Sequence, residues 1–278
     1  MLGPQGTLTQ RAGFSTTAPT VLDHVQINGA VTVKHDFTCT DCRIIGSADA
    51  SGSSYTVKVI SSVGQKFKCV RCEIVARNAD TKALVSYGNA GIWLERTIVR
   101  GGEDAYYGKP SAGHYTVGGI TYGHVFIESM FTDLQTFSGS HADAFQIDGG
   151  TGGVLLLRSR IQSYAVPQGA DPLTTTADGS VLAAGGVILT QDSSKPSQIS
   201  KVHLIDNWYD GGNYTVDTAP PDGLPVTDVR TEGGKWGLKH RFGALRGPRG
   251  VNNRWGATGS TICNGTTVQV VDESPLTC

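Results

Sequence analysis

The chain has 278 residues, with 23 Lys or Arg against 24 Asp or Glu, so its formal net charge at pH 7 is −1. A chain so close to neutrality has no bulk positive field, which argues against nucleic acid as its partner. No stretch reaches the roughly 18 apolar residues that suggest a membrane-spanning helix, and residues 1–20 lack the apolar core of a signal peptide. Glycine is frequent at 37 residues, and charged residues make up only 17%. Together with many short β-branched runs, this composition indicates an all-β repeat protein.

Residues 1–20 are expected to form an irregular N-terminal arm. From residue 21 the chain alternates as a strand does, for example in Val25-Gln26-Ile27 and Val31-Thr32-Val33. An eight-residue template, apolar-x-apolar-x-x-small-x-apolar, then recurs at intervals between 25 and 48 residues. Its copies begin at Phe37, Phe67, Ile92, Val125, Val154 and Val202. A repeat of this length indicates a solenoid.

Long stretches with a 3.6-residue period, which a helical solenoid needs, are missing. We therefore predict an all-β, right-handed parallel β-helix over residues 21–258, whose coils stack about 4.8 Å apart. A β-sandwich is the alternative, but its turns usually recur about every 8–12 residues. A further strand is expected in each interval between template copies. These strands are predicted at residues 55–59, 83–87, 104–108, 143–148, 187–191 and 213–216.

The longest interval contains residues 164–185, which are rich in Ala, Thr, Pro and Gly. We interpret this segment as a long loop inserted into the β-helix and standing over one face. Residues 236–258 are expected to form degenerate last coils. Residues 259–278 are expected to form a C-terminal tail tied down by a disulfide between Cys263 and Cys278.

The pairs Cys39-x-x-Cys42 and Cys69-x-x-Cys72 resemble the ligands of a zinc site. Both pairs occupy equivalent template positions, so stacked coils place Cys39 on Cys69 and Cys42 on Cys72 at about 4.8 Å. That separation suits disulfides and also suits plain buried thiols. We expect a structural role without zinc and leave the pairing of these four cysteines open.

Three segments carry a resemblance to a known family: residues 140–146 (SHADAFQ), residues 210–216 (DGGNYTV) and Arg241-Phe242-Gly243. With the repeat pattern, they resemble right-handed parallel β-helix proteins of the pectate-lyase-like superfamily. The more specific likeness is to secreted actinobacterial proteins and minor tail proteins of actinobacteriophages. The usual form of the first segment there is His-Asn-Asp-Gly-(Ile/Val)-Gln, from which Ala142 and Ala144 depart. The resemblance implies an extracellular or virion-tail location, carbohydrate binding or cleavage, and assembly as a homotrimer or within a virion tail.

Three of the expected strands begin with acidic or amide residues, which alignment places at equivalent points on different coils: Asp104, Asp143 and Asn213. If the coils of Asp104 and Asp143 are adjacent, their carboxylates lie about 5 Å apart. Like charges that close raise one pKa, and this separation suits retaining glycoside hydrolysis. A two-coil offset of about 9.6 Å suits inversion instead. His141 could be the base of a polysaccharide lyase, with Lys109 or a bound cation neutralising a uronate.

We accordingly predict a protein that cleaves extracellular or cell-surface polysaccharide in a lateral groove, as a glycoside hydrolase or a lyase. The predicted catalytic residues are Asp104, Asp143, His141 and Asp148. The predicted substrate-binding residues are Tyr107, Lys109, Gln146, Gln191, Asn213 and Tyr214. No cofactor is expected, except calcium in the case of a lyase. The alternative function is a non-enzymatic adhesion module that binds host glycan, in which Asp143 and His141 hydrogen-bond turn backbones and Gln146 forms a polar ladder.

Overall fold

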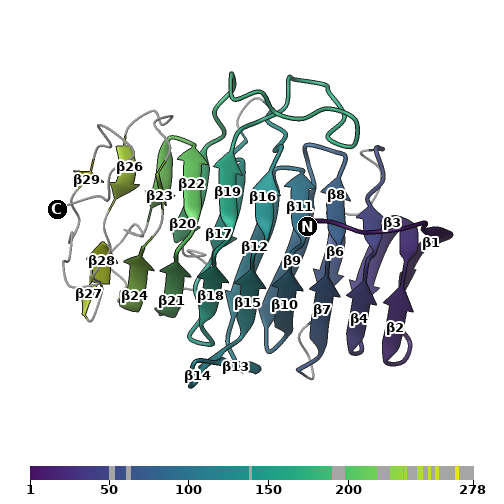
Figure 1. Cartoon of the computed structure of the whole chain (residues 1–278), viewed down its shortest axis with the longest axis horizontal. Coiled ribbons are helices and arrows are strands. Elements are labelled where there is room, and N and C mark those ends of the chain that lie inside the picture. The colour runs from purple at the N-terminus through teal and green to yellow at the C-terminus, as the bar shows by residue number, and fades with distance from the viewer. Residues whose placement is uncertain are drawn as a thin grey trace.

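A computed structural model describes residues 1–49, 54–60, 64–137, 140–189, 198–217, 226–233, 235–236, 243–246, 250–251, 254–256 and 267–268. Across these residues the regular secondary structure consists of strands. Their stacked coils follow one another along the long axis of the molecule, from β1 to β4 at one end to β24 to β29 at the other (Figure 1). The fold is therefore all-β and solenoid-like, with large parallel sheets that nearly close on themselves.

Most strands belong to two sheets, and each full coil contributes one strand to the smaller sheet and then two to the larger one. The ten-stranded sheet comprises β2 (Thr20–Asp23), β4 (Phe37–Thr40), β7 (Lys66–Val70), β10 (Gly91–Glu95), β15 (His124–Ile127), β18 (Val154–Leu157), β21 (Ile199–Ile205), β24 (Val226–Glu232), β27 (Gly250–Val251) and β28 (Arg254–Gly256). The 17-stranded sheet comprises β1 (Thr9–Ser15), β3 (Val25–Val33), β5 (Arg43–Ile45), β6 (Tyr55–Val59), β8 (Glu73–Ala76), β9 (Lys82–Gly88), β11 (Ile98–Gly101), β12 (Asp104–Pro110), β16 (Met130–Thr132), β17 (Asp143–Ile147), β19 (Arg160–Ser163), β20 (Gly185–Leu189), β22 (Trp208–Gly211), β23 (Tyr214–Asp217), β25 (Lys235–Trp236), β26 (Gly243–Arg246) and β29 (Thr267–Val268). A hairpin of β13 (Tyr115–Val117) and β14 (Ile120–Tyr122) projects from the coils (Figure 1).

The recurring template is confirmed for the copies that begin at residues 37, 67, 92, 154 and 202, whose first residues follow one ladder from coil to coil. The copy predicted to begin at Val125 is wrong by one residue, because His124 pairs with Ile92 and with Val154. Phe37 pairs with Phe67 and Cys39 with Cys69 in the parallel ladder between β4 and β7. All four side chains are fully buried and belong to one continuous hydrophobic core. The alternation of apolar and polar residues therefore places one side of each strand in the interior of the coil.

Each template strand ends at a residue with a positive φ angle between 47° and 53°, a left-handed conformation that is uncommon outside glycine. These residues are His24, Asp41, Arg71, Arg96, Glu128, Arg158 and Asp206. Except after His24, the next residue is the small template position, and its side chain is buried. From Cys72 onward, the backbone N–H of one small position donates to the side chain of the small position on the next coil. For example, Ser159 N–H donates to Asn207 Oδ1 at 2.8 Å, and Ser129 N–H donates to Ser159 Oγ at 3.1 Å. The small positions thus satisfy backbone amides that the left-handed turn leaves in the core.

The cysteines stack as expected, but the disulfide lies within one coil. Cys39 and Cys42 are joined, whereas Cys69 and Cys72 are free and buried. Burial raises the pKa of the Cys69 thiol well above its ordinary value. The four cysteines therefore form part of the apolar core.

The predicted insertion is an irregular segment between β19 and β20, and it arches over the corners that follow β16, β11 and β8 (Figure 1). Arg100 Nη2 donates to Leu173 O at 3.4 Å, and Ala177 N–H donates to Asp133 Oδ1 at 2.8 Å. The segment thus lies against the corner that precedes the strands of Asp104 and Asp143.

Other expectations concern the ends of the chain. Within the expected irregular arm, residues 9–15 form β1, which pairs with β3 in parallel. Gln191, Cys263 and Cys278 lie outside the described residues, so their predicted roles stay predictions. In the part of the chain that the structure describes, no helix is long and apolar enough to cross a membrane.

Candidate functional site

Asp104 and Asp143 occupy the first positions of β12 and β17 and are register partners in the parallel ladder. Their coils are therefore adjacent, which is the arrangement that the sequence analysis associated with a close carboxylate pair. The backbone N–H of Asp143 donates to Asp104 Oδ1 at 3.2 Å. A glycine corner at Gly101 and Gly102, both with positive φ, turns the chain into β12 and positions Asp104 at its start.

Both carboxyl groups are buried, with only 1% of Asp104 and 3% of Asp143 exposed. The Lys82 ammonium forms an ion pair with Asp104 and lies 3.4 Å from Glu103 Oε2. Burial raises the pKa of Asp104 to about 6, against the opposing effect of Lys82. Burial also raises the pKa of Asp143 well above its ordinary value, and the charge of Asp104 adds to this shift.

The raised pKa values favour the protonated form of both carboxyl groups, and the ion pair with Lys82 opposes this effect at Asp104. Asp143 Oδ1 has no hydrogen-bond partner among the described residues. Asp143 is therefore the better candidate for the acid and Asp104 the better candidate for the carboxylate. A neutral acid beside a carboxylate is the pair that retaining glycoside hydrolysis requires, at a separation of about 5 Å. Lys82 and Glu103, which are partly exposed, lie between this pair and solvent.

A second group of predicted residues gathers on the outer side of the same strands. Tyr107 pairs in register with Gln146, and its hydroxyl donates to Asp148 Oδ2 at 2.8 Å. Lys109 pairs in register with Tyr87, whose ring meets the Tyr107 ring edge-on at 5.6 Å. We call these five residues the tyrosine face.

Tyr87 was absent from the predicted site, although it ends the predicted strand 83–87. Its side chain is the most exposed aromatic of the face, at 38%. The Lys82 ammonium lies 4.7 Å from the centre of the Tyr107 ring and so links the tyrosine face to the carboxyl pair. Burial raises the pKa values of both Tyr87 and Tyr107, which keeps their hydroxyls protonated as donors.

The remaining predicted site residues lie apart from these two groups or in a different register. His141 is exposed, and its backbone N–H donates to Glu103 Oε1 at 3.3 Å. Asn213 was expected to align with Asp143, but Asp143 pairs with Gly185, and Gly185 pairs with Tyr214. The expected alignment is wrong by one residue because β23 begins at Tyr214, and such a slip exchanges the two faces of a strand.

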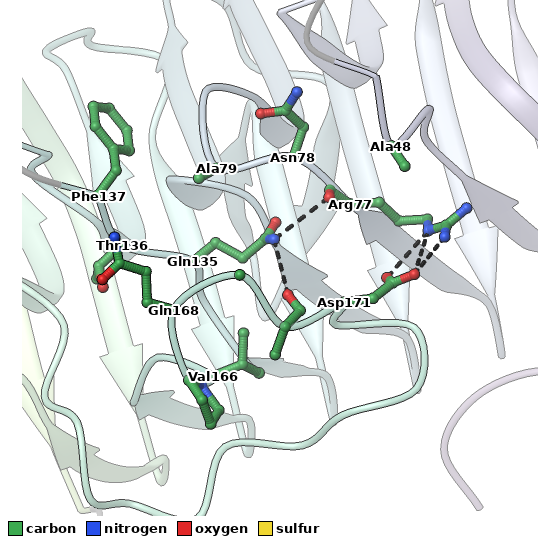
Figure 2. A pocket seen from close by; sticks show the side chains of 13 residues that line it. Ala48, Arg77, Asn78, Ala79, Gln135, Thr136, Phe137, Val166, Gln168 and Asp171 are labelled. Carbon is green, nitrogen blue, oxygen red and sulfur yellow. Dashed lines mark hydrogen bonds and ion pairs between the residues drawn. The ribbon is translucent and has the colours of Figure 1, made fainter.

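The sequence analysis also missed a cavity of about 480 Å³ beneath the insertion. Figure 2 shows its lining, which comes from the corner after β8, the segment after β16 and the first part of the insertion. Gln135 lies at its centre and donates from Nε2 to the carbonyls of Arg77 and Ala170, at 3.4 and 3.3 Å. No local pattern could have revealed this cavity, because its walls meet only after the coils stack.

Metal binding can be weighed at two places. Asp23, His24 and Asp41 bring potential ligand atoms within 4.8 Å of one another. Arg71, however, already holds Asp41 through two hydrogen bonds of 2.8 and 2.6 Å and lowers the pKa of that carboxyl. At the carboxyl pair, oxygen ligands of the kind that calcium prefers are present, but Lys82 already neutralises Asp104.

Comparisons with known proteins return no relative for this chain. No family model matches it, and no match was found among the curated proteins or the solved structures. Its function must therefore be argued from the geometry of the site.

Proposed function

We propose that this protein binds extracellular or cell-surface polysaccharide along the tyrosine face. The observation that carries the proposal is the edge-on contact of the exposed Tyr87 ring with the Tyr107 ring, whose hydroxyl donates to the buried Asp148. An aromatic ring offers an apolar surface to the C–H groups of a sugar, and its polar rim can hydrogen-bond the hydroxyls. Gln146 and Lys109, on neighbouring positions, add an amide and an ammonium group. A long flat face of stacked strands suits an extended polymer better than a small molecule.

Affinity electrophoresis of the full chain against a panel of polysaccharides tests this proposal. Tyr87→Ala is expected to weaken binding by about tenfold or more, since the most exposed ring is lost. Trp93→Ala is the control, because Trp93 is a partly exposed aromatic residue on β10 of the ten-stranded sheet and has no part in the tyrosine face. Equal retardation of the wild type and Tyr87→Ala by every polysaccharide that binds would refute the proposed face.

Cleavage is the second candidate function, and the pairing of two buried carboxyl groups with raised pKa values on adjacent strands favours it. The same polysaccharide panel, followed by reducing ends and by absorbance of unsaturated products, separates the possibilities. Reducing ends without unsaturation indicate a hydrolase, both signals indicate a lyase, and binding with neither signal indicates an adhesion module. Because both carboxyl groups are buried, cleavage requires the chain around Lys82 and Glu103 to move aside for substrate.

The finer points of fold and location belong to the same proposal. We propose a right-handed β-helix of the pectate-lyase-like kind, because crossovers between parallel strands are right-handed in about 98% of cases. A secreted or virion-tail protein that meets glycan outside the cell fits this fold, and a homotrimer or tail assembly is the expected form. Light scattering of the purified chain would test the trimer.

A further inference from the structure

The cavity beneath the insertion is separate from the tyrosine face and from the carboxyl pair. Its walls are the corner residues 77–79, residues 135–137 and residues 166–171 (Figure 2). Its volume of about 480 Å³ lies within the range of roughly 300–1,000 Å³ that is typical of small-ligand sites.

Two features hold the cavity open and rigid. Arg77 Nε lies 3.1 and 2.9 Å from the two carboxylate oxygens of Asp171, across 94 residues of sequence. Asp171 Oδ1 also accepts the N–H of Leu173 at 3.0 Å, which anchors the turn of the insertion. The Gln135 amide donates from Nε2 to the carbonyls of Arg77 and Ala170, and its Oε1 accepts the N–H of Gly102 at 3.2 Å. A site whose walls are already ordered loses little entropy when a ligand binds.

The charges of the cavity cancel. Among the described residues, the charged members of its lining are Arg77 and Asp171, and they pair with each other. An anionic or cationic ligand would therefore have to compete with this pair for its counter-charge.

The uncharged groups of the lining suit a hydroxyl-rich ligand instead. Gln168 is exposed, and its side-chain amide has no partner in the described part of the chain. Asn78 Oδ1 accepts the Asp80 N–H at 2.9 Å, but the Asn78 NH2 group has no partner there. Thr136 adds a hydroxyl group, and the Phe137 ring, 39% exposed, offers an apolar surface beside these amides. Polar amides beside one aromatic ring can contact both the hydroxyls and the C–H surface of a sugar.

We propose that this cavity binds one neutral sugar unit, as a second site for the polysaccharide that the tyrosine face holds; the inference rests on the proposed function. A terminal or branching hexose or N-acetylhexosamine has the required combination of hydroxyl groups, apolar C–H surface and absence of charge. The cavity would then select neutral units of the polysaccharide.

Saturation-transfer NMR and titration of the full chain test the proposal. The neutral probes are glucose, galactose, mannose and N-acetylglucosamine, and the charged probes are glucuronate, galacturonate, glucose 6-phosphate and glucosamine. At least one neutral sugar is expected to bind, and Gln168→Ala and Phe137→Ala should each weaken that binding by about tenfold. Both side chains are exposed, so neither change threatens the fold. Val181→Ala, of similar exposure at 38% and on the insertion but outside the cavity, should leave binding unchanged.

Several outcomes would overturn the inference. The first is that no neutral sugar binds, and the second is that a neutral sugar binds equally well to the wild type and to both cavity variants. The third is that a charged sugar binds more tightly than the neutral ones and that Phe137→Ala abolishes its binding. Polysaccharide binding that depends on Tyr87 but comes without monosaccharide binding would reject the cavity alone. Monosaccharide binding that depends on Gln168, without polysaccharide binding, would support the cavity and reject the tyrosine face.

Discussion

Asp104 and Asp143 are register partners on neighbouring parallel strands, and among the described residues Asp104 forms an ion pair with Lys82 whereas Asp143 forms none. Lys82 neutralises Asp104, whereas Asp143 is left with a buried oxygen that has no hydrogen-bond partner. Because burial raises the pKa of both groups and Lys82 opposes the shift at Asp104, the two carboxyl groups are expected to titrate differently, and the predictions below depend on that difference.

The first prediction concerns Asp143→Asn. The folded-state pKa values of Asp143 and Asp104 are raised, so their contribution to stability is full below the unfolded pKa of about 3.9 and is lost as pH rises through the folded values. With its pKa raised to about 6, Asp104 alone loses up to about 3 kcal/mol over this range. Asp143→Asn should remove the part of this pH-dependent loss of stability that Asp143 causes. The variant should therefore equal or exceed the wild type in unfolding free energy near pH 7.

Urea unfolding at several pH values between about 4 and 8 checks this prediction. Asp80→Asn, at an exposed carboxylate, should follow the wild type. A variant that is much less stable than the wild type at neutral pH would show that Asp143 is ionised there. If the chain cleaves polysaccharide and Asp143 is its acid, the same variant should lose cleavage by several orders of magnitude, because an amide cannot donate the proton.

His124 should give a pH dependence of the opposite sign. Burial lowers its pKa to about 3, and the neutral ring accepts the Tyr106 hydroxyl at Nδ1 while Nε2 donates to Ala90 O at 3.1 Å. Its stabilising contribution is full above the unfolded pKa of about 6.5 and is lost as pH falls toward the folded value, by up to roughly 5 kcal/mol. His124→Gln should flatten the loss of stability in acid, whereas the exposed control His35→Gln should not. Circular dichroism melts over the same pH range would contradict the assignment if both variants behaved alike.

The polar ladder behind the left-handed turns predicts unequal costs for two truncations. Asn207 donates to Leu156 O and to the Tyr209 hydroxyl and accepts the Ser159 N–H, all at 2.8 to 2.9 Å. Asn207→Ala removes three buried hydrogen bonds at once and should cost roughly 3 kcal/mol or more of unfolding free energy. Ser159→Ala removes the acceptor of one amide and should cost about 1–2 kcal/mol.

Denaturant unfolding at one pH compares the two variants, with Ser200→Ala as the control because its hydroxyl makes an exposed bond of 3.4 Å. Costs for Asn207→Ala and Ser159→Ala that do not exceed the cost of the control would mean that water replaces the ladder.

The ion pair between Arg77 and Asp171 should hold the insertion without contributing much to global stability. Both side chains are about 30% exposed, at 29% and 30%, so Asp171→Asn should change the unfolding free energy by only about 1 kcal/mol. Local opening of residues 164–184 should increase, because the anchor of the insertion to the corner after β8 is weakened. Limited digestion with elastase should therefore cut this segment faster in the variant. Arg158→Ala, which removes an exposed pair with Glu128 elsewhere, should digest as the wild type does.

The sequence by itself was enough to identify the repeat and most of the strands. Phe37 and Phe67, or Cys39 and Cys69, recur at the same template position, and stacking coils must bring equal positions together. The alternation of apolar and polar residues predicted strands with one buried side, although it left the assignment of the two sides uncertain by one residue. The sequence offered adjacent coils for Asp104 and Asp143 as one of two arrangements, and the ladder between β12 and β17 decided between them.

Only the tertiary structure decided what surrounds those positions. Burial of the carboxyl pair, the contact of Tyr87 with Tyr107 and the shift from Asn213 to Tyr214 depend on where each coil turns. The turns vary in length from coil to coil, so a repeat pattern cannot give the lateral register to within one residue. The cavity depends on a contact between Arg77 and Asp171, which lie 94 residues apart. Such a contact leaves no pattern in the local sequence, because the position of the insertion depends on how it packs against the stacked coils.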